Sequence, residues 1–310
     1  MYGLGANALD ANAAAKIFAA KQRALNDPLI VHIADIKALP RLTGEGWVGA
    51  AREGAKLLIE KFWPGPLTLV LPRGERIPRI VTAGGEKVAI RMPNHAVALA
   101  LIHAAGVPIA APSANLFGHV SPTTAQHVLD DLDGRIDLIL DGGPTTIGVE
   151  STVLDVTVDP PQILRPGGVT REQIKNALAI GYWLLDESHQ LPIANSQSPP
   201  SPGMLEKHYA PNARLVITKD THALKSLLIE SKIENPKSKI GLLLMAHEQA
   251  AFLDHSPKFV LGENYNTAAQ NLYAGLRALD SADVDMILVT QVEPVGIGEA
   301  IADRLRRAAN

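Results

Sequence analysis

Two cations one residue apart, Lys21 and Arg23, are the first side chains in the sequence that could do chemistry. They end an Ala- and Lys-rich stretch that begins at Asp10 and predicts a helix with Asp10 as its N-cap. Lysine and arginine held this close can bind the phosphate groups of a nucleotide. A solvated helix C-terminus, where the helix dipole favours positive charge, is the commoner reason for such a pair. The spacing leaves both interpretations open.

Two further arginines stand where predicted strands end. Arg91 ends the apolar run that starts at Lys87, and Arg165 directly follows Ile163-Leu164. In open α/β sheets, ligands bind beyond the carboxyl ends of the strands. Both guanidinium groups are therefore candidate ligand contacts.

Small hydroxyl and amide residues gather in three segments, Pro112–Asn115, Ser121–Thr124 and Gly148–Thr152. Such residues in turns beside buried strands can bind phosphate groups or an amino acid, but they also form ordinary turns and N-caps. His32 lies inside the apolar run Leu29–Ile33. A core histidine satisfied by hydrogen bonds is the usual explanation for that placement.

Several familiar motifs are absent or lack their structural context. The chain has no GxxxxGK[ST] phosphate loop. No strand precedes Gly3-Leu4-Gly5, and no strand follows Gly296-Ile297-Gly298, so both glycine pairs predict tight turns rather than dinucleotide sites. No histidine and carboxylate pair has convincing metal-ligand spacing. The lack of cysteine excludes disulfides, cysteine-ligated zinc and thiol nucleophiles.

The composition is that of an ordinary soluble globular protein. The 310 residues suggest two domains or one large one, and they are 46% hydrophobic and 20% charged. A net charge of −3 predicts no general attraction to nucleic acid. No apolar run reaches the roughly 20 residues of a membrane span, and the N-terminus does not read as a secretory signal. We therefore expect no membrane partner and a cytoplasmic location.

Alternating patterns predict an α/β fold with two parts. The first part has expected helices at 10–23, 47–62, 96–105 and 170–179, and expected strands at 29–33, 67–71, 87–91, 108–111, 136–140, 152–156 and 162–164. Thr170 and Gln173 predict a capping box. Residues 188–211, rich in proline and serine, predict a linker. Strands at 215–218, 240–245, 259–261 and 286–290, separated by helical stretches, then predict a small parallel sheet.

Taken in order, these segments resemble the threonylcarbamoyl-AMP synthase family in its long form, which joins a YrdC-like catalytic domain to a C-terminal extension. The matching segments cover nearly the whole chain: Tyr2–Gly5, Lys21–Ile33, Phe62–Leu71, Val88–Pro93, Pro108–Asn115, Gly148–Val153, Leu164–Gly167 and Ser201–Pro211. The resemblance implies a twisted mixed-sheet domain over residues 1–183. A linker that acts as a lid follows over 184–212, and a small Rossmann-like parallel-sheet domain over 213–310.

The resemblance also implies an activity. The family joins L-threonine, bicarbonate and ATP into threonylcarbamoyl-AMP and pyrophosphate, with Mg²⁺ held through the ATP phosphates. The product serves the threonylcarbamoyladenosine modification of tRNA. The implied partners are therefore these substrates, together with tRNA and the proteins that transfer the threonylcarbamoyl group.

The family's roles carry over residue by residue. Lys21 and Arg23 match its catalytic pair on the nucleotide phosphates. Ser113 and Asn115 match the phosphate and metal end of the site, and His208 and Tyr209 match the lid. The full expected ATP set is Lys21, Arg23, Asp27, Arg91, Ser113, Asn115, Thr123, Arg165 and Tyr209. The expected L-threonine set is His32, Arg91 and Ser151.

The sequence departs from the family at three places. The family pattern expects a strand and a Pro-Thr-(Glu/Asp)-Thr-Val segment directly before Tyr2, and Met1 stands where that valine is expected. A start upstream of Met1, or a shortened form that has lost a substrate-binding threonine, would explain this. Ala24 replaces a usual proline. Leu205-Glu206-Lys207 replaces a more basic stretch, which weakens the expectation of a nucleotide or RNA contact there.

Two other functions stay open at this point. The first is a YrdC-like RNA-binding or regulatory module that has lost catalysis, which the departure at Met1 favours and the Lys21/Arg23 and Ser113/Asn115 pairs oppose. The second is a carbamoyl-transfer enzyme that uses carbamoyl phosphate. The absence of the zinc-finger-like cysteines expected beside such a domain argues against it.

Overall fold

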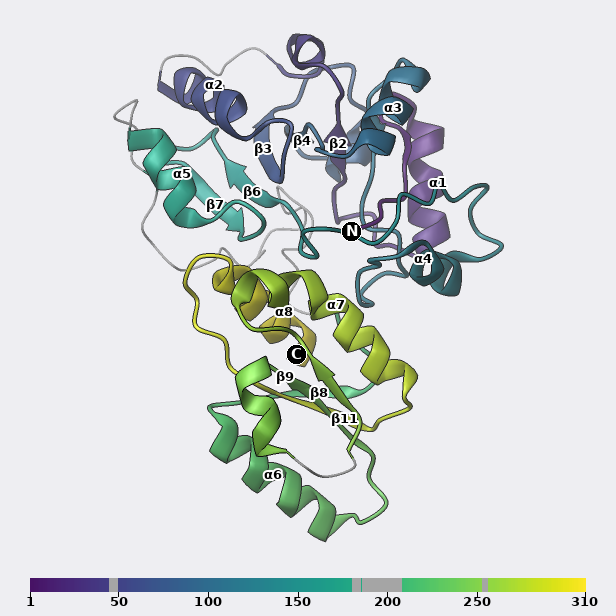
Figure 1. Ribbon diagram of the computed structural model, residues 1–310. Coiled ribbons are helices and arrows are strands. Elements are labelled where there is room, and N and C mark those ends of the chain that lie inside the picture. The colour runs from purple at the N-terminus through teal and green to yellow at the C-terminus, as the bar shows by residue number, and fades with distance from the viewer. Residues whose placement is uncertain (45–49, 180–184, 186–207, 253–255) are drawn as a thin grey trace.

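The computed structural model describes residues 1–44, 50–179, 185, 208–252 and 256–310. The chain forms two sheets, one in each of the two lobes drawn in Figure 1. The fold class expected from the sequence is confirmed: a mixed sheet in the N-terminal domain and a separate parallel sheet in the C-terminal domain. Within the described ranges, no helix is both long enough and apolar enough to cross a membrane.

The N-terminal sheet has seven strands in the order β1-β5-β2-β4-β3-β6-β7. Two of its pairs, β2 with β4 and β3 with β6, are parallel, and the others are antiparallel. The strands are β1 (Ala6–Asn7), β2 (Ile30–His32), β3 (Leu67–Pro72), β4 (Lys87–Arg91), β5 (Ile109–Ala110), β6 (Thr152–Asp155) and β7 (Gln162–Arg165). The helices are α1 (Ala11–Lys21), α2 (Ala50–Phe62), α3 (Ala96–Ala105), α4 (Ala125–Leu132) and α5 (Arg171–Leu178), with 3₁₀ turns η1 (Ile36–Arg41) and η2 (Arg79–Thr82).

The two faces of this sheet are different. In β3, Leu67, Leu69 and Leu71 point into the main hydrophobic core, which also contains buried side chains of α1, α2 and α5. Because side chains alternate along a strand, Val70 lies on the other face, in a small cluster with Ile30 of β2 and three further residues. Helices therefore bury one face, and the second face has only a thin apolar layer.

The C-terminal domain has four parallel strands in the order β10-β9-β11-β8, as the repeating βα pattern predicts. Its elements are β8 (Arg214–Thr218), α6 (Thr221–Glu234), β9 (Ile240–Leu244), η4 (Ala246–Ala251), β10 (Lys258–Val260), α7 (Tyr265–Ser281), β11 (Met286–Thr290) and α8 (Gly298–Ala309). Figure 1 shows α7 and α8 between this sheet and the N-terminal domain. Most of the expected linker, and with it the boundary near residue 183, lies outside the described residues. The expected ranges 1–183, 184–212 and 213–310 therefore stay predictions.

Most expected elements are confirmed, including the capping box between Thr170 and Gln173. The strand expected at 136–140 is wrong. Ile136 and Ile139 instead pack against α4, while Leu138 is 74% exposed and Leu140 is 44% exposed, so the alternating apolar residues do not share a buried face. Helix α4 was not predicted, because its eight residues bury only Val128 and Leu132.

Gly148 marks a close approach between the two domains. Its φ is +81°, and a Cβ built there would lie 2.1 Å from the carbonyl oxygen of Ala269 in α7. No side chain larger than hydrogen fits unless the helix moves away. The packing of the domains therefore depends on glycine at this position.

We expect Gly148→Ala to lower the free energy of unfolding by about 3 kcal/mol, because it adds a clash to an unfavourable backbone conformation. Gly134→Ala is the matched control. Gly134 has φ +69° with nothing within 4 Å of the point that a Cβ would occupy, so only the backbone penalty of about 1 kcal/mol applies. Denaturant unfolding of the two variants measures the difference, and equal losses would show that α7 is not in close contact with Gly148.

Candidate active site

The sheet register places His32 and Arg91 side by side on the thinly covered face. Ile30 pairs with Ala89, and His32 pairs with Arg91. Residues two apart on a strand share a face, so His32 and Arg91 share the face of Ile30 and Ala89, which belong to the small second cluster. Burial, reinforced by Arg91, lowers the pKa of His32 to about 3, so its ring is neutral. Its Nδ1 atom is buried and makes no hydrogen bond within the described structure.

Lys21 is the last residue of α1 and is only 1% exposed. Its ammonium group donates to the carbonyl oxygens of Ser113, at 2.6 Å, and of Asn115, which both lie in the loop after β5. Burial, followed by the charge of Arg23, lowers the pKa of Lys21 well below its usual value. The structure thus brings the predicted helix-end cation together with the predicted Ser113–Asn115 turn.

Arg23 is held by the turn that follows α1. Its guanidinium lies 2.7 Å from the carboxylate of Asp27 and donates to the main-chain carbonyls of Asp27 and Pro28. It also lies over the ring of Phe117, 5.6 Å from the ring centre. This geometry suits Asp27 to orienting Arg23, and its expected contact with ATP stays a prediction.

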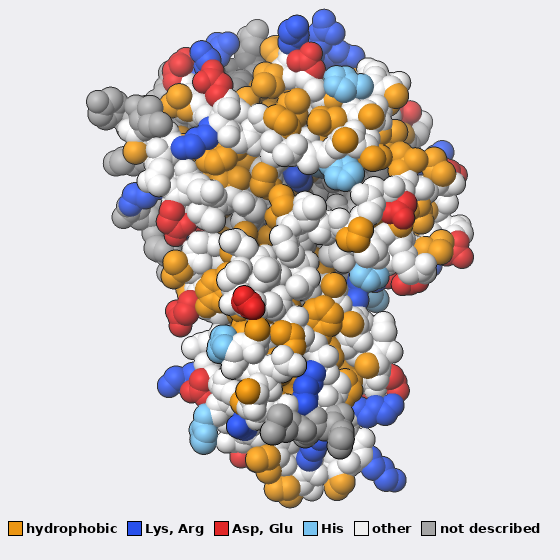
Figure 2. Space-filling view, in the orientation of Figure 1, with side chains coloured by type: hydrophobic (Ala, Val, Ile, Leu, Met, Phe, Trp, Pro, Cys, Tyr) orange, Lys and Arg blue, Asp and Glu red, His pale blue; other side chains and the backbone are white. Residues whose placement is uncertain are grey.

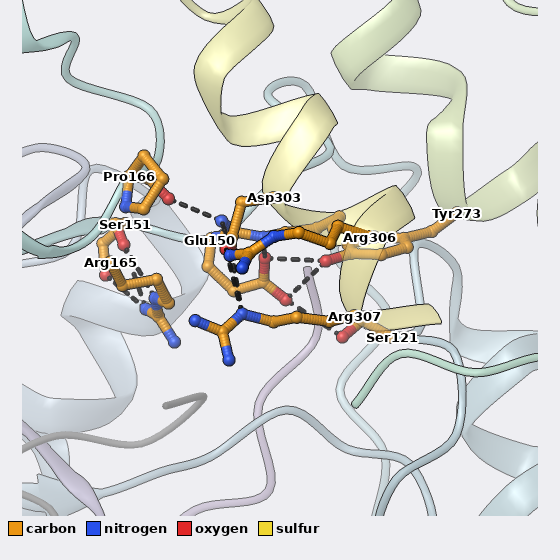
Figure 3. Close-up of polar contacts among 10 residues, drawn as sticks. Ser121, Glu150, Ser151, Arg165, Pro166, Tyr273, Asp303, Arg306 and Arg307 are labelled. Carbon is orange, nitrogen blue, oxygen red and sulfur yellow. Dashed lines mark hydrogen bonds and ion pairs between the residues drawn. The ribbon is translucent and has the colours of Figure 1, made fainter. Parts of the chain in front are cut away.

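Arg91 and Arg165 occupy the strand ends that the sequence indicated. The Nε atom of Arg91 donates to the carbonyl of Gly65 at 2.8 Å. Burial and the charge of Arg165 lower the pKa of Arg91 to about 10. Arg165 donates to the carbonyl of Ser151 at 3.0 Å, and the Ser151 hydroxyl lies 2.7 Å from that of Thr68. Figure 3 shows the Ser151 and Arg165 side chains in contact.

His208 and Tyr209 lie close to these groups, since Arg23, Lys21 and Arg165 all act on the charge of His208. Their rings lie 4.1 Å apart, and His208 also meets Phe117 edge-on at 6.2 Å. The segment is held by both domains, because the His208 amide donates to the carbonyl of Arg307 and the Ala210 amide to that of Gly118. The Tyr209 hydroxyl and the Nδ1 atom of His208 are buried without a hydrogen-bond partner in the part of the chain that is described. These polar atoms are available to a bound molecule.

Four cations therefore lie in one region: Lys21, Arg23 and Arg165 are buried, and Arg91, which is half-buried, lies close enough to Arg165 to feel its charge. Such a set suits an anion with several phosphate oxygens. It does not suit a metal cage, and the described residues contain no group of three His, Cys, Asp or Glu side chains that could hold an ion.

Thr123 makes its contacts elsewhere. Its hydroxyl and amide lie 3.3 Å from the Nδ1 atom of His127, at the start of α4. Its expected contact with ATP stays a prediction.

A surface pocket of about 460 Å³ lies beside Phe117, lined by Phe117, Gly118, His119, Ala210, Pro211 and Asn212.

Sequence reasoning missed Glu150, Phe117, Tyr273 and Arg304. Glu150 stands in the Gly148–Thr152 segment but received no role there. Burial would raise its pKa, yet Arg304, Arg165 and the Tyr273 hydroxyl lower that pKa to about 2. No local pattern in α7 or α8 singles out Tyr273 or Arg304. Only the folded chain brings them to Glu150.

Fold and side chains together define a class: a two-domain α/β protein with a cluster of four cations beside its mixed sheet. A family model described as telomere recombination, which groups Sua5, YciO and YrdC, matches residues 1–167. A second, described as the C-terminal domain of threonylcarbamoyl-AMP synthase, matches residues 169–310.

Individual relatives agree with these matches. The chain is similar to the threonylcarbamoyl-AMP synthases of Bacillus subtilis, at 46% identity, and of Pyrococcus abyssi, at 42%. Each alignment covers 100% of this chain, with 87% of the first relative and 88% of the second. The crystal structure of P. abyssi Sua5 complexed with L-threonine superposes with a TM-score of 0.88 at 42% identity, over 99% of this chain and 87% of that one. This chain belongs to the threonylcarbamoyl-AMP synthase family.

The burial of His208 predicts acid sensitivity. Burial, followed by the charge of Arg23, lowers the pKa of His208 from 6.5 to about 3. Burial of the neutral ring therefore contributes its full stability above pH 6.5, which is the ordinary pKa of histidine in the unfolded chain. The contribution is lost as the pH falls from 6.5 toward 3. Between pH 7.5 and pH 5.5 we expect the titration of His208 alone to lower the free energy of unfolding by about 1 kcal/mol, in addition to the similar contribution of His32.

The matched variant is His208→Gln, which lacks this titration but keeps that of His32. Denaturant unfolding at both pH values should show a smaller loss in the variant than in the wild-type chain. Equal losses in the two proteins would mean that His208 is not held neutral by burial.

Proposed function

We propose that this chain joins L-threonine, bicarbonate and ATP into threonylcarbamoyl-AMP and releases pyrophosphate. The observation that carries the proposal is the group of buried Lys21, Arg23 and Arg165 with half-buried Arg91, a concentration of positive charge that a polyphosphate would neutralise. Family membership supports the same activity, and a relative has been crystallised with L-threonine.

The reaction needs little covalent chemistry from the protein. The amine of threonine captures bicarbonate as a carbamate, with loss of water. A carbamate oxygen then attacks the α-phosphorus of ATP, and the bond from that phosphorus to the leaving pyrophosphate breaks. Positioning and charge neutralisation dominate such a transfer. Lys21 and Arg23 would neutralise the phosphates, with Ser113 and Asn115 holding Lys21 through their carbonyl groups.

L-threonine would lie on the sheet face near His32, Arg91 and Ser151. A neutral His32 can exchange hydrogen bonds with threonine without adding charge, while Arg91 supplies a cation for the carboxylate. His208 and Tyr209 would exclude water, to which carbamates and mixed anhydrides are lost. We propose Mg²⁺ as a companion of ATP, since the described residues offer no ready-made set of ligands.

The product would serve threonylcarbamoyladenosine formation in tRNA, in the cytoplasm, through a separate transfer protein. Direct binding of tRNA has little support on the visible face of Figure 2, where Lys and Arg side chains are interspersed with Asp and Glu. The net charge of −3 agrees with this. We therefore propose small-molecule substrates as the direct ligands of the site.

Pyrophosphate release with and without L-threonine and bicarbonate tests the function. We expect release that requires both, and a drop of about 100-fold in kcat for Lys21→Ala and for Arg23→Ala, because each removes a buried group that stabilises phosphate charge. Lys16→Ala is the matched control, since Lys16 is exposed on the same helix. Pyrophosphate release that does not depend on L-threonine, or equal activity in Lys21→Ala and Lys16→Ala, would contradict the proposal. RNA binding without turnover would instead support a module that has lost catalysis.

A further inference from the structure

Glu150 is a buried carboxylate whose partners come mostly from the other domain. It directly precedes Ser151, which lies on the proposed threonine side of the site. Its oxygens accept from the hydroxyl of Tyr273 in α7, at 2.7 and 2.9 Å, and from Nε of Arg304 in α8, at 3.0 Å. Only Ser121, at 3.1 Å, is a side-chain partner from the described part of the N-terminal domain. Figure 3 shows the Tyr273 and Ser121 hydroxyls directed at Glu150.

Arg304 reaches three parts of the site with one guanidinium group. Its Nε bonds Glu150, next to Ser151. Its Nη1 donates at 2.6 Å to the carbonyl of Pro166, the residue after Arg165. The same guanidinium lies over the ring of Tyr209, 5.4 Å from the ring centre. Arg304 is 0% exposed, so these contacts are made out of water.

Buried contacts of this kind are sensitive to the loss of one partner. Removing one member of a buried ion pair leaves an uncompensated charge that must move or take up a proton. Misplacement of a substrate-holding group by 1 Å can slow an enzyme by about 100-fold. A change at Arg304 is therefore expected to move Ser151 and the turn after Arg165.

Two other ion pairs between the domains have a different geometry. Arg171 of α5 bonds Glu299 of α8 at 2.7 Å, and Arg277 of α7 bonds Asp131 of α4 at 2.6 Å. Each pair joins a helix of one domain to a helix of the other, whereas Arg304 reaches the strand-end segments that carry Ser151 and Arg165. Arg277 also donates to the carbonyl groups of Val120 and Ser121, close to Glu150, so the Arg171–Glu299 pair is the better comparison for a purely structural role.

We propose that Arg304, assisted by Tyr273, is a positioning residue that the C-terminal domain contributes to the active site. It sets Glu150-Ser151 on the threonine side, Pro166 on the nucleotide side and Tyr209 above both. The inference rests on the proposed function for its kinetic consequences. The C-terminal domain is then a working part of the synthase rather than an attached module.

Arg304→Lys tests the proposal, because an ammonium keeps the charge but cannot span Glu150 and Pro166 as a planar fork does. We expect KM for L-threonine to rise about tenfold, through misplacement of Ser151. Tyr273→Phe, which removes one hydroxyl and retains the ring, should shift KM in the same direction by a smaller factor. Arg171→Met, the matched control, should leave KM for L-threonine unchanged even where it lowers the melting temperature.

Amide hydrogen exchange gives a readout that does not need turnover. The Thr152 amide donates to the main-chain carbonyl of Pro66, and the Gly168 amide donates to the main-chain carbonyl of Glu150, each at 2.9 Å. Both amides should exchange faster in Arg304→Lys and stay protected in Arg171→Met. If Arg304→Lys and Arg171→Met alter KM and exchange alike, the positioning role is wrong. If the wild-type chain releases no pyrophosphate, the proposed function fails, and the exchange data alone decide the positioning role.

Discussion

The burial of like charges is the constraint on which this structure depends. Lys21, Arg23 and Arg165 lie together out of water, with half-buried Arg91 beside Arg165, and repulsion between cations is stronger there than at a surface. Carbonyl groups from the loop after β5 and from neighbouring strand ends offset part of the cost, and Asp27 and Glu150 offset more. A bound triphosphate would neutralise the remaining excess of positive charge. The loops around the site are therefore shaped by the need to hold these groups.

The mixed sheet makes this arrangement possible because only one of its faces is needed for the main core. Helices α1, α2 and α5 cover that face, so the second face is free to carry His32 and Arg91. The C-terminal domain then covers the edge of the site. Glu150 marks this junction, since its charge is stabilised by a helix more than 150 residues further along the chain.

The sequence predicted the features that depend on residues close to one another in the chain. The helix end at Lys21, the strand ends at Arg91 and Arg165, and the capping box at Thr170 all depend on near neighbours, and the structure has each of them. The prediction of a strand at 136–140 was wrong because the tertiary packing, which the sequence does not reveal, leaves Leu138 exposed. The Arg304 contact could not be predicted from one sequence, since it joins positions 154 residues apart and no periodic pattern marks it.

The backbone of Tyr209 has a φ of +64°, in the left-handed region that residues with a Cβ adopt only at a cost of about 1 kcal/mol or more. Packing against Tyr273 and Arg304 holds it there. The docked conformation is therefore not the one that this segment prefers by itself. Contacts with the C-terminal domain therefore offset a backbone cost at Tyr209, so the conformation of this segment is coupled to the docking of α7 and α8.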